Sequence, residues 1–417
     1  MRVVEFGQFV AVPVASQWLA DGGAHVIKVE SIQGDPIRLI NPLVADESRY
    51  FISRNTGKHS LPLALSDPAA QPVIKALLAH ADVVLMNLRP GLAEKLGLDS
   101  TTLRQQHPQL IIGSVSAFGL QGEEADRAGM DLVVQARSGL MAANGRVVDG
   151  RPAAGDPVSA DVMCAMTLAF GISAALLRRE RTGQGGVVDT SLMQAAMTLA
   201  NNQLVRSERE DATHQAATLD ELAALQTQGA PYQEQLALLQ AARNAPLLMI
   251  YYRTYATADG HVAIACGSHA LRLKFVTALN IDDPVLTESF SGDMQAHYSE
   301  LAQQVEQRMA QHASEHWLRT LLEAGIPIST VKFPMELFDD DQVAANQMLH
   351  TLEHPLAGDI TMVAPPLTMD HQGFIPGHPT APFGSETRLI LSELGFSDDT
   401  INQLVTDHVT HTGASQN

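Results

Sequence analysis

Residues Arg2–Glu30 read RVVEFGQFVAVPVASQWLADGGAHVIKVE, and this stretch decides the fold class. Its two ends, RVVEF and HVIKVE, are short apolar runs typical of buried strands. Between them, Pro13 opens the helical pattern PVASQWLAD, which Gly22 and Gly23 close. A strand, a helix and a strand of these lengths predict two parallel strands joined by the helix.

The same alternation continues to about residue 120. Asp67 and Pro68 start a second helical pattern, PAAQPVIKALLAHA, and the strand patterns DVVLMN and QLIIGSVSAFG follow it. The sequence therefore predicts an α/β fold, with a parallel sheet and helices on both of its faces. Ligands of such sheets bind at the carboxyl ends of the strands.

The glycine patterns argue against a nucleotide cofactor. The first strand–helix loop reads FGQFVAVP and lacks the GxGxxG fingerprint, so a nicotinamide or flavin cofactor has no motif to support it. The stretch TGQGG at Thr182–Gly186 lies between a helical pattern and the strand pattern VVDTSL. We interpret it as a helix C-cap and turn rather than a phosphate-binding loop.

Composition excludes several classes of function. The 417 residues carry 46 acidic and 27 basic side chains, and a net charge of −19 is unsuited to nucleic acid. Cys164 and Cys266 have no metal-ligand spacing, and we expect both in the core and no bound metal. No signal-peptide pattern opens the sequence, and the apolar run Val162–Leu177 is interrupted by small polar residues. We expect a buried helix there, no membrane association and a soluble, cytoplasmic protein.

The later part of the chain changes character. Ser207–Asn244 is rich in Gln, Ala and Glu and predicts a solvated helical connection. A hairpin signal around Asp259 and Gly260 then begins a second lobe of mixed strands and helices, running to about Val331. The tail predicts two amphipathic helices, the second capped by Ser397. Asp407, His408 and His411 are expected in a frayed end rather than at a metal.

Asp156, between Gly155 and Pro157, stands directly before the long apolar run. Aspartate is a favoured N-cap, and proline is favoured at the first helical position. From the residues alone, helix capping is the preferred interpretation and a nucleophilic carboxylate is the alternative.

Nine stretches, taken in order, point to one family. They are VIKVESIQGDPIR, RNTGKHSLPLAL, ADVVLMNLRPGLAEKLGLD, GMDLVVQARSG, AAGD, RTGQGGVVDTSL, YRTYATADGHVAIACG, AGIPISTV and APFGSETRLILSELG. Together they resemble the family III CoA-transferases, the group of formyl-CoA and carnitine CoA-transferases, to which the α-methylacyl-CoA racemases are related. The resemblance runs from residue 2 to about 409, and the Ser207–Asn244 segment has no counterpart in it.

The resemblance implies a domain organisation. Residues 1–206 would form a large Rossmann-like domain that binds CoA and carries the nucleophile, and 207–244 a helical connection. Residues 245–331 would form a smaller α+β domain, and 332–417 would return to the large one. Two such chains would interlock as a homodimer.

The resemblance also implies an activity. Asp156 matches the family's nucleophile, which takes CoA from an acyl-CoA donor through an aspartyl-CoA thioester and passes it to a small carboxylic acid. CoA would be a substrate, with no permanently bound cofactor. The helix N-terminus after Asp156 would keep its carboxylate ionised, so capping and catalysis are compatible. The implied contacts to CoA are Val10, Ala11, Arg38, Leu63, Asn87, Leu88, Arg89, Lys95 and Met130.

Departures from the family pattern leave the substrate acid open. Val10 stands where the family often has Gln, with Gln8 two places away, and no run of four glycines occurs in the second lobe. The Lys and Tyr of formyl-CoA transferase match Ala128 and Met130. Two alternatives remain: an α-methylacyl-CoA racemase or epimerase, and a non-catalytic CoA-binding paralogue. Met130 stands where the racemases have a proton-carrying His, and Asp131 beside it is expected to cap or orient the loop.

Overall fold

The computed structural model describes residues 1–417 except Asp156, 243–246, 288–289, 375–376 and 414–417. Its backbone divides into two compact units. The first comprises Met1–Asp211 and Ala344–Asn417, and the second comprises Ala212–Val343. The domain boundaries expected after residues 206, 244 and 331 stay predictions.

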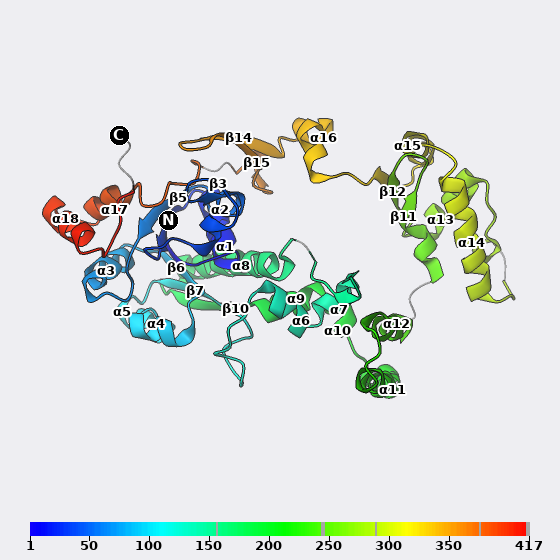
Figure 1. The fold of residues 1–417 in the computed structure, drawn as a ribbon, viewed down its shortest axis with the longest axis horizontal. Coiled ribbons are helices and arrows are strands. Elements are labelled where there is room, and N and C mark those ends of the chain that lie inside the picture. Colours follow the sequence, from blue (N-terminus) through cyan, green and yellow to red (C-terminus); the bar gives the residue numbers. More distant parts are fainter. Residues whose placement is uncertain (156, 243–246, 288–289, 375–376, 414–417) are drawn as a thin grey trace. The chain divides into compact units, whose positions relative to one another are not determined.

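A six-stranded parallel sheet is the centre of the first unit (Figure 1). Its order is β10-β7-β6-β1-β2-β5, and every neighbouring pair is parallel. The strands are β1 (Arg2–Phe6), β2 (His25–Glu30), β5 (Lys58–Pro62), β6 (Val83–Met86), β7 (Ile111–Ser116) and β10 (Gly186–Ser191). The predicted α/β fold with a parallel sheet is confirmed.

Alternate side chains of each strand enter cores on opposite faces of the sheet. In β1, Val3 joins the core on one face and Val4 the core on the other, and β6 repeats the pattern with Val83 and Val84. One face is covered by α1 (Ala11–Asp21), α6 (Asp131–Arg137), α7 (Leu140–Asn144), α8 (Ser159–Thr182) and α9 (Leu192–Leu199). The other is covered by α3 (Gln71–Ala79), α4 (Pro90–Leu96), α5 (Ser100–Gln106), α17 (Thr387–Glu393) and α18 (Asp398–Thr406).

Helix α8 is the longest helix of the described chain. One side packs into the core through Cys164, Leu168 and Ile172, whereas Phe170 on the other side is 77% exposed. The prediction of a buried helix is therefore right for one side only. By length and composition alone α8 could cross a membrane, a test that core helices of soluble proteins also pass. Gly183, at φ 71°, ends the helix, which confirms the predicted cap and turn.

Smaller elements complete the first unit. They are α2 (Arg49–Asn55), α10 (Asn201–Leu204) and the two-stranded ribbons β3–β4 (Pro42–Val44, Glu47–Ser48), β8–β9 (Val147–Val148, Arg151–Pro152), β14–β15 (Leu349–His354, Gly358–Val363) and β16–β17 (Thr368–Met369, Gln372–Gly373). The short helix α16 (Asp341–Ala345) spans the boundary between the two units.

The second unit has a core of its own. The predicted hairpin is present: β11 (Tyr252–Ala256) pairs antiparallel with β12 (His261–Ala265), and β13 (Ile328–Thr330) adds the third strand. Helices α13 (His269–Leu279), α14 (Met294–Met309) and α15 (Ser314–Glu323) pack on these strands around buried aromatic side chains. The segment before the hairpin forms α11 (Glu208–Thr227) and α12 (Tyr232–Ala242), and α11 buries no side chain, as a solvated helix should.

The chain end is tied to the sheet, and the prediction of a frayed tail at residues 407–411 is wrong. Thr410 pairs with Leu63, which follows β5, and its hydroxyl donates to the carbonyl of Pro62 at 2.6 Å. Val409 is buried, and the carbonyl of His411 accepts from the Thr387 hydroxyl at 2.6 Å. Ser397 caps α18 as predicted.

Candidate active site

The strand order reverses beside β1, because the chain proceeds from β1 to β2 on one side and later places β6 on the other. The loops after β1 and β6 therefore leave the same edge of the sheet at a switch point, where such folds bind ligands. A reciprocal pair of hydrogen bonds joins these loops. The N–H of Gln8 donates to Oδ1 of Asn87 at 3.0 Å, and Nδ2 of Asn87 donates to the carbonyl of Gln8 at 2.9 Å.

The loop after β1 has a fixed and unusual backbone. Phe9 has a φ of 65°, a region that large side chains rarely adopt. Its N–H points at the Asp35 carboxylate, 3.3 Å from the nearer oxygen. At Gly7, an added Cβ would lie 2.3 Å from the Val12 side chain, so only glycine fits. The loop therefore leads into α1, with Val10 at its N-cap, along one defined path.

Buried charges beneath the loop hold it in place. Lys28 donates to Glu5 at 2.8 Å and to the carbonyl of Gly7 at 2.9 Å, and it lies 3.0 Å from Asp35. Lys58 donates to the other oxygen of Glu5 at 2.9 Å. Burial opposes ionisation of Glu5, but the two ammonium groups outweigh it and lower the pKa of Glu5 to about 2. Burial lowers the pKa of Lys58 to about 8.

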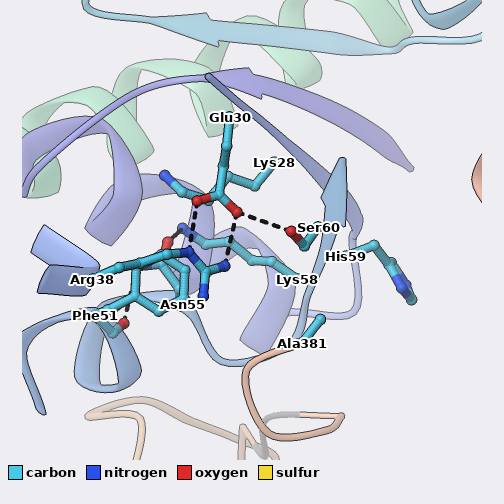
Figure 2. A pocket seen from close by; sticks show the side chains of 9 residues that line it. All are labelled: Lys28, Glu30, Arg38, Phe51, Asn55, Lys58, His59, Ser60 and Ala381. Atoms are coloured by element: carbon cyan, nitrogen blue, oxygen red, sulfur yellow. Dashed lines mark hydrogen bonds and ion pairs between the residues drawn. The ribbon is translucent and has the colours of Figure 1, made fainter. Parts of the chain in front are cut away.

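Arg38 belongs to this buried layer. Figure 2 shows its guanidinium bound to both oxygens of Glu30, each at 2.8 Å. It also donates to Glu47 at 2.6 Å and stacks 3.5 Å above the ring of Phe51. At 2% exposure, Arg38 forms a buried ion pair with each of two carboxylates, and its expected contact with CoA stays a prediction.

The other expected CoA contacts are spread over several environments. Ala11 and Leu63 are buried in the two cores, Leu88 is partly buried, and Met130 is 55% exposed before α6. Arg89 is the N-cap residue of α4, and Lys95 lies in its last turn. Both are exposed, and neither makes an ion pair with any residue that the structure describes. Arg89 follows Asn87 by two residues, and Lys95 lies on the helix that begins there.

Asp156 lies outside the described residues, but the loop that leads to it is held by three contacts. The N–H of Ala153 donates to the carbonyl of Arg146, and the Arg146 guanidinium donates to the carbonyl of Ala154, both at 3.0 Å. The N–H of Gly155 donates to Oε1 of Gln135 at 3.1 Å. A Cβ on Gly155 would lie 3.1 Å from Nδ2 of Asn144, so a larger residue would push against this amide.

The start of α8 is capped by Asp131 of α6. Oδ1 of Asp131 accepts from the N–H groups of Ala160 and Asp161 at 2.9 and 3.1 Å. The N-cap residue itself is Val158, which has no side-chain cap. The expectation that Asp131 caps or orients the loop is confirmed. Helix capping by Asp156, the preferred interpretation from the residues alone, concerns a residue outside the described part of the chain and stays a prediction.

Gln135 is the functional residue that sequence reasoning missed. It is fully buried, and its amide lies between Asp131 and Gly155. The signal was present in the sequence, because residues four apart face the same side of a helix, and DLVVQ places Gln135 one turn after Asp131.

Other chemistries have little support in the described chain. Among the described residues, no group of three or more His, Cys, Asp or Glu side chains is placed to hold a metal ion. Burial raises the pKa of Cys164 to about 12 and that of Cys266 to about 11, so both thiols are protonated packing groups, as expected. Burial, aided by the Asp131 charge and opposed by Arg54, raises the pKa of Asp161 to about 7.

The comparisons with known proteins agree with this architecture. The model of CoA-transferase family III matches residues 1–386. Succinyl-CoA:mesaconate CoA-transferase of Haloarcula hispanica is 31% identical, over 96% of this chain and 97% of that protein. Cinnamoyl-CoA:phenyllactate CoA-transferase of Clostridium sporogenes is 27% identical, over 98% and 95%. The crystal structure of Rv3272 from Mycobacterium tuberculosis superposes with a TM-score of 0.74 at 27% identity, over 94% and 97% of the two chains.

Proposed function

This chain belongs to CoA-transferase family III and is a CoA-transferase, and we propose that Asp156 carries CoA between its two substrates as an aspartyl thioester. The observation that carries the proposal is the built loop before Asp156. Gln135 and Arg146 hold residues 153–155, and Asp131 fixes the helix that follows. These hydrogen bonds fix the backbone on both sides of Asp156, and a nucleophile requires such accurate placement to attack its substrate.

The proposed reaction needs no net proton transfer. The Asp156 carboxylate attacks the acyl carbonyl, the C–S bond breaks, and CoA thiolate leaves behind a mixed anhydride. The thiolate then attacks the aspartyl carbonyl and releases the donor acid as its carboxylate. The acceptor carboxylate attacks the resulting aspartyl thioester, and the thiolate returns to the acceptor's acyl carbon, which frees Asp156.

Arg89 and Lys95 are proposed to bind the phosphates of CoA. Both are exposed, Arg89 two residues after Asn87 and Lys95 on α4, and have no ion pair in the part of the chain that is described. On a chain with a net charge of −19, an anionic substrate needs such local cations. The acceptor is proposed to be a small carboxylic acid.

The racemase alternative is weakened by Met130. A racemase needs two acid/base groups facing the α-carbon, and the thioether of Met130 carries no proton at the matching position. A 2-methylacyl-CoA incubated with the enzyme in deuterated water should therefore gain no deuterium at its α-carbon. Deuterium incorporation at the α-carbon with steady turnover would favour the racemase over the proposed transfer reaction.

The active form is proposed to be an interlocked homodimer. The outer side of α8 supports it, because Met166, Phe170 and Leu177 are 49%, 77% and 55% exposed in the single chain. An apolar helix side of this kind is usually covered in an obligate assembly. A cytoplasmic location is also proposed, and the two free cysteines are consistent with a reducing compartment.

Replacing Asp156 by Ala tests the nucleophile. The rate of CoA transfer should fall below about one-thousandth of the wild-type rate, with the fold and CoA binding retained. An activity above about one-tenth of wild type would reject Asp156 as the covalent carrier, because no other residue of the loop has a carboxylate.

A further inference from the structure

Two buried side chains of α6 connect the beginning of α8 to the loop before Asp156. Asp131 is 6% exposed and Gln135 is fully buried. One oxygen of Asp131 accepts from two N–H groups of α8, and the other accepts from Nε2 of Gln135 at 2.5 Å. Oε1 of the same amide accepts from the N–H of Gly155. The three contacts form a continuous chain from helix to loop.

The direction of every bond in this chain is set by Asp131. A carboxylate can only accept, so Gln135 must turn its NH2 group toward Asp131. Its carbonyl oxygen is then left to accept from the N–H of Gly155, and Nε2 also lies 3.5 Å from the carbonyl oxygen of Gly155. A reversed amide would bring its NH2 against the N–H of Gly155, donor against donor, in a buried place.

We propose that Asp131 is a positioning residue for Asp156: through the amide of Gln135 it fixes the backbone of Gly155 and thereby the approach of the next residue to the acyl carbonyl. This inference rests on the proposed function of Asp156. It adds to that function the claim that Asp131 and Gln135 position the attacking carboxylate without contacting the substrate. Misplacing a nucleophile by about 1 Å costs on the order of 100-fold in rate.

The test exchanges the polarity of the pair. In Asp131→Asn, the remaining oxygen still caps α8, but the new NH2 group faces the NH2 group of Gln135. The glutamine turns over and loses its bond to the N–H of Gly155. We expect kcat to fall about 100-fold with the KM for acyl-CoA within about twofold of wild type. In Gln135→Glu, two carboxylates face each other, and the same pattern of loss is expected.

The double variant Asp131→Asn/Gln135→Glu restores the donor–acceptor pairs that link α8 to the N–H of Gly155, and it loses only the 3.5 Å contact of Nε2 with the Gly155 carbonyl. The Asn NH2 group donates to one Glu oxygen, and the other Glu oxygen accepts from Gly155, so kcat should return to within about fivefold of wild type. A matched control makes the same exchange on the exposed pair Gln403 and Asp407 of α18, whose side chains bond at 2.8 Å. Neither the single nor the double exchange there should change kcat.

Three outcomes overturn the inference. One is a kcat near wild type in both single variants. Another is a double variant that stays as slow as the single ones while its thermal unfolding and KM match wild type. A fall in stability with a matching rise in KM, unrepaired in the double variant, also overturns it, because the pair is then only structural. Failure of Asp156 as the nucleophile is seen separately, since wild type would then form no adduct on that residue.

Discussion

Gln8 and Asn87 bind each other through two hydrogen bonds, one in each direction, although 79 residues separate them. Gln8 follows β1 and Asn87 follows β6, so the pair ties the two loops at the point where the strand order reverses. The amide of Asn87 serves as both donor and acceptor. An aspartate has the same shape, but its ionised carboxylate can only accept.

Asn87→Asp should loosen this site without unfolding the protein. The carboxylate still accepts from the N–H of Gln8, but it cannot donate to the carbonyl, which it now repels. We expect the KM for acyl-CoA to rise about tenfold, with a smaller change in kcat, in steady-state assays. The exposed Asn402→Asp on α18 is the control. An unchanged KM would show that the tie between the loops does not shape the CoA site.

Arg89→Ala and Lys95→Ala should each weaken acyl-CoA binding and spare turnover. Phosphate contacts hold the ground state and the transition state alike, so the loss appears in KM. A loss of about 10-fold to 100-fold per cation fits a charge-assisted contact. Arg104→Ala, which removes an exposed cation from α5, is the control and should have no effect. If KM is unchanged in both variants, Arg89 and Lys95 do not bind the phosphates of CoA, and the nucleotide binds elsewhere.

Stability should depend on pH through Asp21. This residue is 8% exposed, and its Oδ1 has no hydrogen-bond partner among the residues that the structure describes. Burial, opposed by Lys58, raises its pKa from 3.8 to about 7. The folded state therefore holds a proton that the unfolded state has lost, so stability falls as pH rises from about 4 to 7. A shift of this size corresponds to about 4 kcal/mol at most.

Asp21→Asn should remove that dependence. In urea unfolding at pH 5 and pH 8, the variant should lose less stability between the two values than wild type does. Asp126→Asn, an exposed change, should keep the wild-type difference. Equal pH dependence in wild type and Asp21→Asn would mean that this carboxyl is ionised in the folded protein at little cost.

Phe170→Asp should prevent assembly, because it places a charge on the exposed apolar side of α8. Sedimentation at nanomolar concentration should show dimer for wild type and monomer or aggregate for the variant. Two differently tagged wild-type pools should form no hybrids over hours, since interlocked chains cannot exchange without unfolding. Hybrids within minutes, or an intact Phe170→Asp dimer, would reject the interlocked arrangement.

Much of the large domain was predictable because its strands are short apolar runs between helical patterns with clear caps. A capping or orienting role of Asp131 was expected as well, although the helix that it caps was not identified from the sequence. The burial of Arg38 was not predictable: its partners Glu30 and Glu47 lie eight and nine residues away, and only the turn and ribbon between them bring all three together inside the core. The cap that Asp131 gives to α8 was not predictable in this detail, because it comes from another helix, a contact that local sequence does not encode.

The outer side of α8 shows a second limit. An apolar run predicts burial, but it does not say whether the covering surface belongs to the same chain. The prediction of a frayed tail was wrong because a polar chain end can still pair with a distant part of the same chain. Thr410 pairs with Leu63 after β5, and Val409 is buried.

The covalent step is tested most directly by trapping. Hydroxylamine added to the enzyme during turnover with acyl-CoA should attack the aspartyl thioester and leave a hydroxamate, which peptide mass spectrometry would locate at Asp156. The adduct should require both acyl-CoA and hydroxylamine, and Asp156→Ala should give none. A fully active enzyme that forms no hydroxamate at Asp156 under these conditions would contradict the account.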